Sequence, residues 1–346
     1  MLLHVENLDV EYEKSAGFKK ILDNISLQIG RYSRVGIIGE SGSGKTQFVH
    51  SILGLLNGSP GVTSGKIVFR GKELLNTDSG DEKTWRESYV QNSTSVRGND
   101  ISIIFQDAKA SLIPYQTINE QIIETWKFLD LKGGEKEAIE KASTTLRALN
   151  LNDIDRVLKS YPDQMSGGEC QRVYIMLALL GDPLLLIADE PTSSLDDANA
   201  RTLLNHLNDL CTNRGISLLL ISHEIEDIIR FTDYVYVMYN GSIMEAFVIS
   251  DSDVMVSTSK SNHPYTKTLL KVANGKFGVM QNEQSISSCV EQNKDTLKNE
   301  FKGCPYYYYC GLRKELSGDS QNKCLDEKPA LHEVSKNNKV ACWHVD

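Results

Sequence analysis

The sequence has no long apolar run and no excess of positive charge. No stretch approaches the roughly 18 uncharged apolar residues that cross a bilayer, and Met1 to Glu6 lacks the features of a secretion signal. Lysine and arginine number 37 against 46 aspartate and glutamate, which gives a net charge of −9. Such a balance argues against a nucleic-acid partner that needs a basic surface. We expect a cytoplasmic protein that would reach a membrane only through partners.

Cysteine is sparse until the end of the chain. Four of the seven cysteines fall between residues 304 and 342, in the pattern C-x₅-C-x₁₃-C-x₁₇-C. In a reducing compartment such a group favours metal over disulfides. The C-x₂₋₄-C pairs common in zinc sites are absent. An iron–sulfur cluster, a Zn²⁺ ion and no metal at all remain open for Cys304, Cys310, Cys324 and Cys342.

Residues 39–46 read Gly-Glu-Ser-Gly-Ser-Gly-Lys-Thr and fit the phosphate-binding pattern G-x-x-x-x-G-K-[ST]. A short apolar strand, 34–38, precedes them, and residues 47–56 carry apolar side chains at helical spacing. This context favours a P-loop over a chance glycine-rich turn, with the lysine on the phosphates and the threonine hydroxyl on Mg²⁺. The predicted nucleotide-binding residues here are Gly39, Ser41, Gly42, Ser43, Gly44, Lys45, Thr46 and Gln47.

The rest of the pattern predicts an α/β fold. Alternating residues in 2–12 and 21–29 indicate an antiparallel β layer. The apolar runs 101–105, 184–188 and 216–221 indicate buried strands of a parallel sheet. Residues 118–158 show helical spacing, whereas the polar residues 76–100 indicate a surface loop with one helical turn near Trp85.

Polar residues follow three of these buried strands. They are Gln106, the pair Asp189–Glu190, and His223. The carboxyl edge of an open α/β sheet is where ligands bind. Hard oxygen ligands from Thr46 and Asp189 suit Mg²⁺. The alternative interpretations are that Glu190 is only a solvated carboxylate and that His223 is only a structural histidine.

Seven elements in this order resemble the nucleotide-binding subunit of an ABC transporter. They are Tyr12, the P-loop, Gln106, Ser166-Gly167-Gly168-Glu169, the strand ending in Asp189–Glu190, the segment ending in Asp196, and His223. The resemblance covers about residues 1–250. It implies a P-loop NTPase core of the ABC type with an antiparallel β layer and a helical subdomain at about 107–180.

The resemblance also implies a role for each position. Tyr12 would stack on adenine, although a half-buried strand tyrosine is the alternative. Thr46, Gln106 and Asp189 would serve Mg²⁺, and Glu190, His223 and Gln106 would orient the attacking water. Two subunits would sandwich two ATP molecules. In that dimer the residues completing the partner's site or lying at the interface would be Ser166, Gly167, Gly168, Glu169 and Asp196.

Residues 251–346 form a C-terminal extension. Residues 257–261 are predicted to be a linker, and 274–300 a flexible or irregular loop. Between them, 262–270 resembles the segment that follows the core in importer ATPases for oligopeptides, dipeptides and nickel. The four-cysteine tail also resembles theirs, with a longer middle interval, which implies a [4Fe–4S] cluster, with Zn²⁺ as the alternative.

We therefore predict an ATP-hydrolysing subunit that powers import of peptides or nickel chelates from the cytoplasmic face of the membrane. Its predicted partners are a second, different ABC ATPase subunit, two integral-membrane permeases and, indirectly, an extracytoplasmic binding protein. The alternatives are a soluble ABC-type ATPase of translation or DNA maintenance and a redox-sensing nucleotide-binding module.

Overall fold

The computed structural model describes residues 1–15, 17–193, 195–249, 263–273 and 302–345. The predicted linker at 257–261 and the predicted loop at 274–300 lie outside the described residues. Within the described ranges, no helix has both the length and the apolar character needed to cross a membrane.

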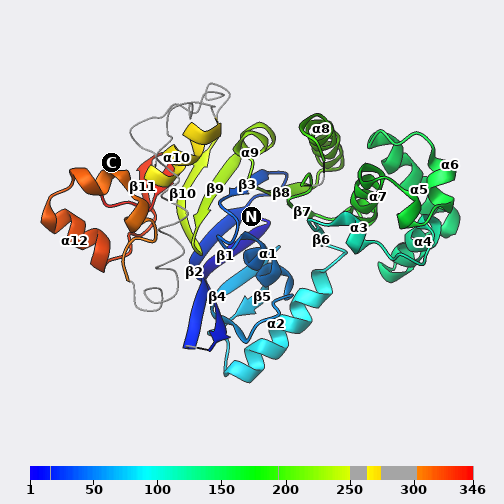
Figure 1. The fold of residues 1–346 in the computed structure, drawn as a ribbon. Coiled ribbons are helices and arrows are strands. Elements are labelled where there is room, and N and C mark those ends of the chain that lie inside the picture. Colours follow the sequence, from blue (N-terminus) through cyan, green and yellow to red (C-terminus); the bar gives the residue numbers. More distant parts are fainter. Residues whose placement is uncertain (16, 194, 250–262, 274–301, 346) are drawn as a thin grey trace.

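An eight-stranded sheet forms the centre of the molecule, in the order β11-β12-β10-β9-β3-β8-β7-β6 (Figure 1). Strands β6, β7, β8, β3 and β9 run parallel, and β10, β12 and β11 continue the sheet in antiparallel fashion. The bounds are β3 Arg34–Ile38, β6 Ile101–Ile104, β7 Leu185–Asp189, β8 Ser217–Ser222, β9 Tyr234–Tyr239, β10 Ser242–Val248, β11 His332–Ser335 and β12 Asn338–Val340.

A second, antiparallel sheet of four strands has the order β2-β1-β4-β5. Together with α1 (Lys45–Leu53) it buries one face of the central sheet, because alternate side chains of a strand point to opposite faces. In β7, Leu185 and Ile187 enter this core. Leu186 and Ala188 enter the core on the other face, under α8 (Asp197–Arg214) and α9 (Ile225–Phe231). The second sheet consists of β1 Leu3–Lys14, β2 Gly17–Ile29, β4 Pro60–Phe69 and β5 Lys72–Asn76.

The predicted helical subdomain lies beyond β6 at one end of the central sheet (Figure 1). Its helices pack through apolar faces such as Ile122, Ala142 and Leu146, all fully buried. Residues 132–134 separate two of these helices. The bounds are α3 Ala108–Ser111, α4 Ile118–Phe128, α5 Glu135–Ala148, α6 Ile154–Lys159 and α7 Gly167–Leu179.

The prediction of a surface loop at 76–100 is wrong, because most of this segment is the helix α2 (Glu82–Val96). Asp81 caps its first turn by accepting a hydrogen bond from the Thr84 N–H. Trp85, Tyr89 and Val96 are buried against the second sheet and α1. These apolar residues are helically spaced, but the many polar residues between them conceal the pattern.

The C-terminal extension joins the central sheet. Strand β12 pairs with β10, with Glu245 opposite Val340, and α10 (Pro264–Ala273) and α12 (Gly318–Asp326) lie on the same side of the molecule (Figure 1). Buried Tyr265, Cys304 and Tyr306 belong to the main core. The division into domains at residue 250 stays a prediction, since 250–262 lie outside the described residues.

Candidate functional site

The P-loop connects β3 to α1. Gly39 is required by a close approach, because a Cβ there would lie 2.1 Å from the Met238 carbonyl oxygen. Gly42 and Gly44 have φ angles of +79° and +104°, which L side chains rarely adopt. The loop thus has the tight curvature that turns backbone N–H groups toward a phosphate.

Lys45 is buried at the first turn of α1. Its ammonium donates to the carbonyl oxygens of Gly39 at 2.7 Å and Glu40 at 2.9 Å. Burial lowers its pKa, and the carboxylates of Glu190, Asp189 and Glu40 act in the opposite direction. A buried cation beside curled backbone amides fits the phosphates of a nucleotide.

Thr46 and Asp189 meet beside the lysine. The Thr46 hydroxyl donates to Asp189 Oδ2 at 2.9 Å. Asp189 ends β7, is only 5% exposed, and has its pKa raised by burial. The hydroxyl and carboxylate oxygens are ligands that Mg²⁺ prefers, so this pair is suited to hold the ion that accompanies a nucleotide.

Glu190 lies between two of the predicted partners. Its Oε2 accepts a hydrogen bond from Gln106 Nε2 at 3.0 Å, and its Oε1 lies 3.5 Å from His223 Nδ1. The three residues follow β6, β7 and β8, so the sheet edge brings together segments far apart in sequence. Glu190 also has a left-handed backbone, with φ of +49°. Such a backbone at a non-glycine residue often marks a functional site.

Tyr12 lies in β1 and is half-buried. Its hydroxyl donates to the Gln47 side-chain oxygen, which links it to α1 two residues after Lys45. A Cβ on Gly58 would lie 2.2 Å from the Tyr12 ring, so glycine is needed there. The structure therefore brings Tyr12 to the P-loop helix, while its stacking on adenine stays a prediction.

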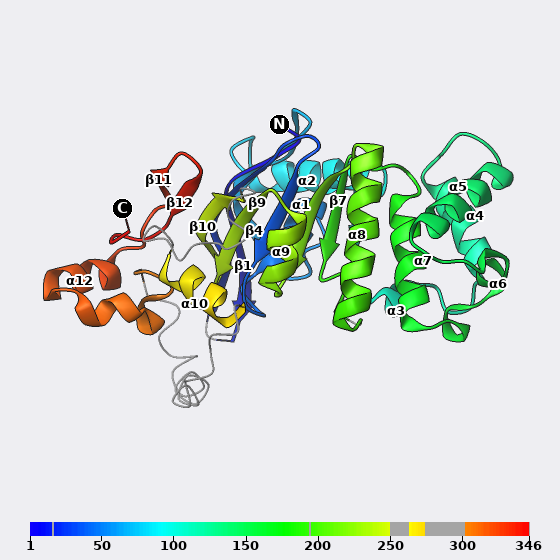
Figure 2. The ribbon, with the colours of Figure 1, turned by 90° about the horizontal axis from the view of Figure 1, so that it is seen from above.

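Ser166 begins α7 with a capping box. Its hydroxyl accepts from the Glu169 N–H at 3.3 Å, and Glu169 Oε2 accepts from the Ser166 N–H at 2.9 Å. Arg156 holds the Glu169 carboxylate. Figures 1 and 2 both place α7 on the other side of β7 from α1. Among the described residues, no hydrogen bond or ion pair joins Ser166–Glu169 to the P-loop.

Asp196 is exposed and caps α8. Its carboxylate accepts from the backbone N–H of Asn199 at 3.0 Å, which lowers its pKa. It is therefore not part of the cluster formed by Lys45, Thr46 and Asp189 in the same chain.

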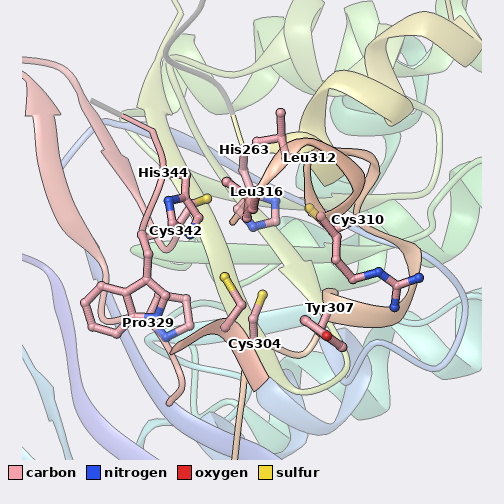
Figure 3. Close-up of a pocket in the computed structure, with 12 residues that line it drawn as sticks. His263, Cys304, Tyr307, Cys310, Leu312, Leu316, Pro329, Cys342 and His344 are labelled. Carbon is pink, nitrogen blue, oxygen red and sulfur yellow. The ribbon is translucent and has the colours of Figure 1, made fainter. Parts of the chain in front are cut away.

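The four clustered cysteines line one pocket in the C-terminal extension, shown in Figure 3. Cys304, Cys310, Cys324 and Cys342 surround it together with His263 and His344. Burial raises the pKa of the Cys304 thiol to about 12 and that of Cys342 to about 11. Yet within the described ranges no three His, Cys, Asp or Glu side chains form a group that could hold a single metal ion.

Comparison with known proteins identifies the family. The profile described as "ABC transporter" matches residues 22–193. A probable peptide ABC transporter ATP-binding protein of Sinorhizobium fredii is 32% identical, over 99% of this chain and 95% of that protein. The chain belongs to the ABC transporter ATP-binding proteins. An oligopeptide transport ATP-binding protein of Bacillus subtilis, 31% identical over 99% and 96% of the two chains, places it in the oligopeptide and dipeptide group of that family.

A solved structure supports the same assignment. A dimeric ATP-binding cassette in a post-hydrolysis state, bound to ADP and phosphate, superposes with a TM-score of 0.60 at 25% identity. The superposition covers 72% of this chain and 99% of the cassette. The predicted fold and enzyme class, an ABC-type ATPase, are confirmed.

Sequence reasoning missed one residue that contacts the P-loop from the C-terminal extension. Tyr265 touches the P-loop, since its hydroxyl accepts from the Glu40 N–H at 3.1 Å across 225 positions of sequence. The segment 262–270 was notable only as a family feature. Its His-Pro pair, typical of a helix start, was the only local signal.

Proposed function

We propose that this chain binds ATP with Mg²⁺, hydrolyses it, and thereby powers the import of peptides through separate membrane permeases. The observation that carries the proposal is the Glu190 carboxylate, positioned by Gln106 and His223 beside the Thr46–Asp189 pair. The relatives are named for peptide, oligopeptide and dipeptide transport, which favours peptides over nickel chelates.

Each residue has a proposed role in hydrolysis. Lys45 and the P-loop amides are placed to bind the phosphates, and Thr46 and Asp189 would hold the Mg²⁺ ion, which would supply positive charge to the phosphates. Glu190 accepts a proton from the attacking water. His223 and Gln106 keep the Glu190 carboxylate and that water in line with the γ-phosphate.

The Glu190→Gln variant tests this assignment. It keeps the shape of the side chain but removes the base, so we expect steady-state hydrolysis to fall by about 10²- to 10⁴-fold. ATP affinity, measured with a fluorescent ATP analogue, should stay near that of the wild type. Thr94→Val, which removes an exposed hydroxyl on α2, serves as a control with unchanged turnover. Wild-type hydrolysis by Glu190→Gln would contradict the role of Glu190.

The proposed ATPase acts as half of a dimer. Helix α7 lies on the other side of β7 from α1 (Figures 1 and 2). Its N-cap and first residues, Ser166, Gly167, Gly168 and Glu169, are proposed to complete the site of a second ABC ATPase subunit, which is proposed to be a different chain. The solved cassette of similar fold is itself described as dimeric. Asp196, exposed at the start of α8, is proposed to lie at the dimer interface.

The helical subdomain is the proposed contact to the permeases. Tyr115, just before α4, and Phe128, at its end, are each 79% exposed there. Tyr115 lies between α3 and α4, in the segment that follows Gln106 along the chain, and we propose that this segment links the ATP site to the permease contact. This contact would hold the chain at the cytoplasmic face of the membrane, with an extracytoplasmic binding protein as an indirect partner.

We further propose that the four cysteines bind a [4Fe–4S] cluster. They line one pocket, but they do not converge as ligands of one ion must. Since each iron of a cluster takes its own thiolate, a cluster spreads its ligands more widely than Zn²⁺ does. The raised thiol pKa values mean that metal binding would release protons.

Anaerobic purification followed by iron, sulfide and zinc analysis tests the cluster. We expect iron and acid-labile sulfide in equal amounts with broad visible absorbance, lost in Cys342→Ala. Cys211→Ala is the matched control, because Cys211 is also buried but lies in α8, away from the pocket. Zinc without iron, or iron retained equally in both variants, would overturn the proposal.

A further inference from the structure

Tyr265 connects the C-terminal extension to the P-loop. It is only 1% exposed and lies at the start of α10. Its hydroxyl oxygen accepts a hydrogen bond from the Glu40 N–H at 3.1 Å. That N–H belongs to the peptide group between Gly39 and Glu40, whose carbonyl oxygen accepts from Lys45 Nζ at 2.7 Å. One peptide group at the base of the P-loop is thus held by Tyr265 on one side and by the phosphate-binding lysine on the other.

The residues before Tyr265 fix its position. His263 Nδ1 accepts from the Tyr265 N–H at 3.0 Å and so caps α10, while Pro264 occupies the first helical position. Burial lowers the pKa of His263 to about 3, so the ring is neutral and can accept this bond. The His263 N–H in turn donates to Glu245 of β10 at 2.9 Å.

Two further tyrosines enclose the ring of Tyr265. Its centroid lies 4.7 Å from that of Tyr239, at the end of β9, and 5.3 Å from that of Tyr306. Tyr239 and Tyr306 contact each other edge to face at 5.3 Å. Tyr306 is two residues from Cys304, which lines the cysteine pocket. The aromatic cluster of Tyr239, Tyr265 and Tyr306 therefore lies between that pocket and the P-loop.

We propose that Tyr265 is a positioning residue for the P-loop, through which the C-terminal extension sets the affinity for ATP. The proposal rests on the proposed ATP site. Tyr265 fixes the peptide group between Gly39 and Glu40, and the aromatic cluster fixes Tyr265. Because the loop is already held in its curved form, less of the nucleotide's binding free energy is lost to ordering the backbone.

The Tyr265→Phe variant isolates the hydroxyl. Tyr236→Phe is the matched control, because Tyr236 is also buried in the core and its hydroxyl accepts from a backbone N–H, that of Gln28, at 3.0 Å. Both variants lose one tyrosine hydroxyl bonded to the backbone, but only Tyr265 contacts the P-loop. ATP affinity is measured on the purified full chain by titration with a fluorescent ATP analogue and competition by ATP. Urea unfolding reports the stability of each variant.

We expect the dissociation constant for ATP to rise about two- to tenfold in Tyr265→Phe, the range expected for one neutral hydrogen bond. In the assembled ATPase, KM for ATP should rise by a similar factor while kcat stays within about twofold. Tyr236→Phe should keep wild-type affinity even where its stability falls as much. Equal ATP affinity in Tyr265→Phe, Tyr236→Phe and the wild type would overturn the proposal. A wild-type chain that binds no ATP would instead refute the proposed function.

Tyr306→Leu tests the part assigned to the aromatic cluster. It leaves the Tyr265 hydroxyl in place but removes the ring that packs on it from the side of the cysteine pocket. We expect ATP affinity to fall in the same direction as in Tyr265→Phe. Wild-type affinity in Tyr306→Leu would overturn the role of the cluster in holding Tyr265.

Discussion

At the scale of single residues, the Glu245 carboxylate outside the ATP site stands out by its burial and its raised pKa. It is completely buried in β10, where it accepts from the His263 N–H at 2.9 Å and from Asn338 Nδ2 at 3.0 Å. Burial raises its pKa to about 7, although its hydrogen bonds and Lys267 act in the opposite direction. Glu245 thereby links β10, the start of α10 and β12.

The raised pKa predicts a pH-dependent stability. The folded state holds a proton that the unfolded state releases near pH 4.5, so the stabilisation is complete below that pH and is lost as pH rises through 7. Relative to Glu245→Gln, the wild type should lose up to about 3 kcal/mol of unfolding free energy between pH 4.5 and 8. Urea unfolding of both proteins across this range measures it.

Comparing the wild type with Glu245→Gln removes the pH-dependent stability that comes from other groups, because those groups titrate in both proteins. Asp23, whose pKa is lowered by Lys20 and Lys328 against the effect of burial, loses stabilisation as pH falls, but it does so equally in each protein. Parallel stability curves for the wild type and Glu245→Gln would contradict a raised pKa at Glu245.

At the scale of elements, α4 and α7 begin with the same capping box but differ in exposure. Thr117 and Glu120 form it in α4, and Ser166 and Glu169 in α7. After Ser166 comes Gly167, which is exposed, and a Cβ on it would meet no atom within 4 Å. The N-terminus of α7 therefore presents open backbone N–H groups, as an anion-binding helix start does.

Arginine substitutions at the N-caps of α4 and α7 distinguish a loss of stability from a loss of ATP hydrolysis. Ser166→Arg and Thr117→Arg should each cost about 1 kcal/mol of stability through the lost cap. Only Ser166→Arg should lower hydrolysis in the assembled complex, because its helix start is proposed to complete the partner's ATP site. Both variants should keep this chain's own ATP affinity, measured with a fluorescent analogue. Loss of that affinity in the isolated Ser166→Arg chain would show that Ser166 serves its own site instead.

At the scale of the whole molecule, sequence predicted the elements that carry their own local signals. The glycines and Lys45 identify the P-loop, and apolar runs that end in Asp189–Glu190 and His223 identify strands of the sheet. The helix α2 was missed because Trp85 and Tyr89 are the only large buried side chains along most of its length. Tertiary packing against α1 and the second sheet decides its structure, as happens where local propensity is weak.

Order along the chain by itself determined the family and predicted the ATP-site residues, since glycine loops, strand-end carboxylates and caps are set by neighbouring residues. Only the tertiary structure decided which of them meet. It placed Gln106 and His223 around Glu190, separated Ser166 from the P-loop, and brought Tyr265 to Glu40. The physical reason is that such contacts depend on strand order and on how β10 continues the sheet into the extension, which no local pattern of residues encodes.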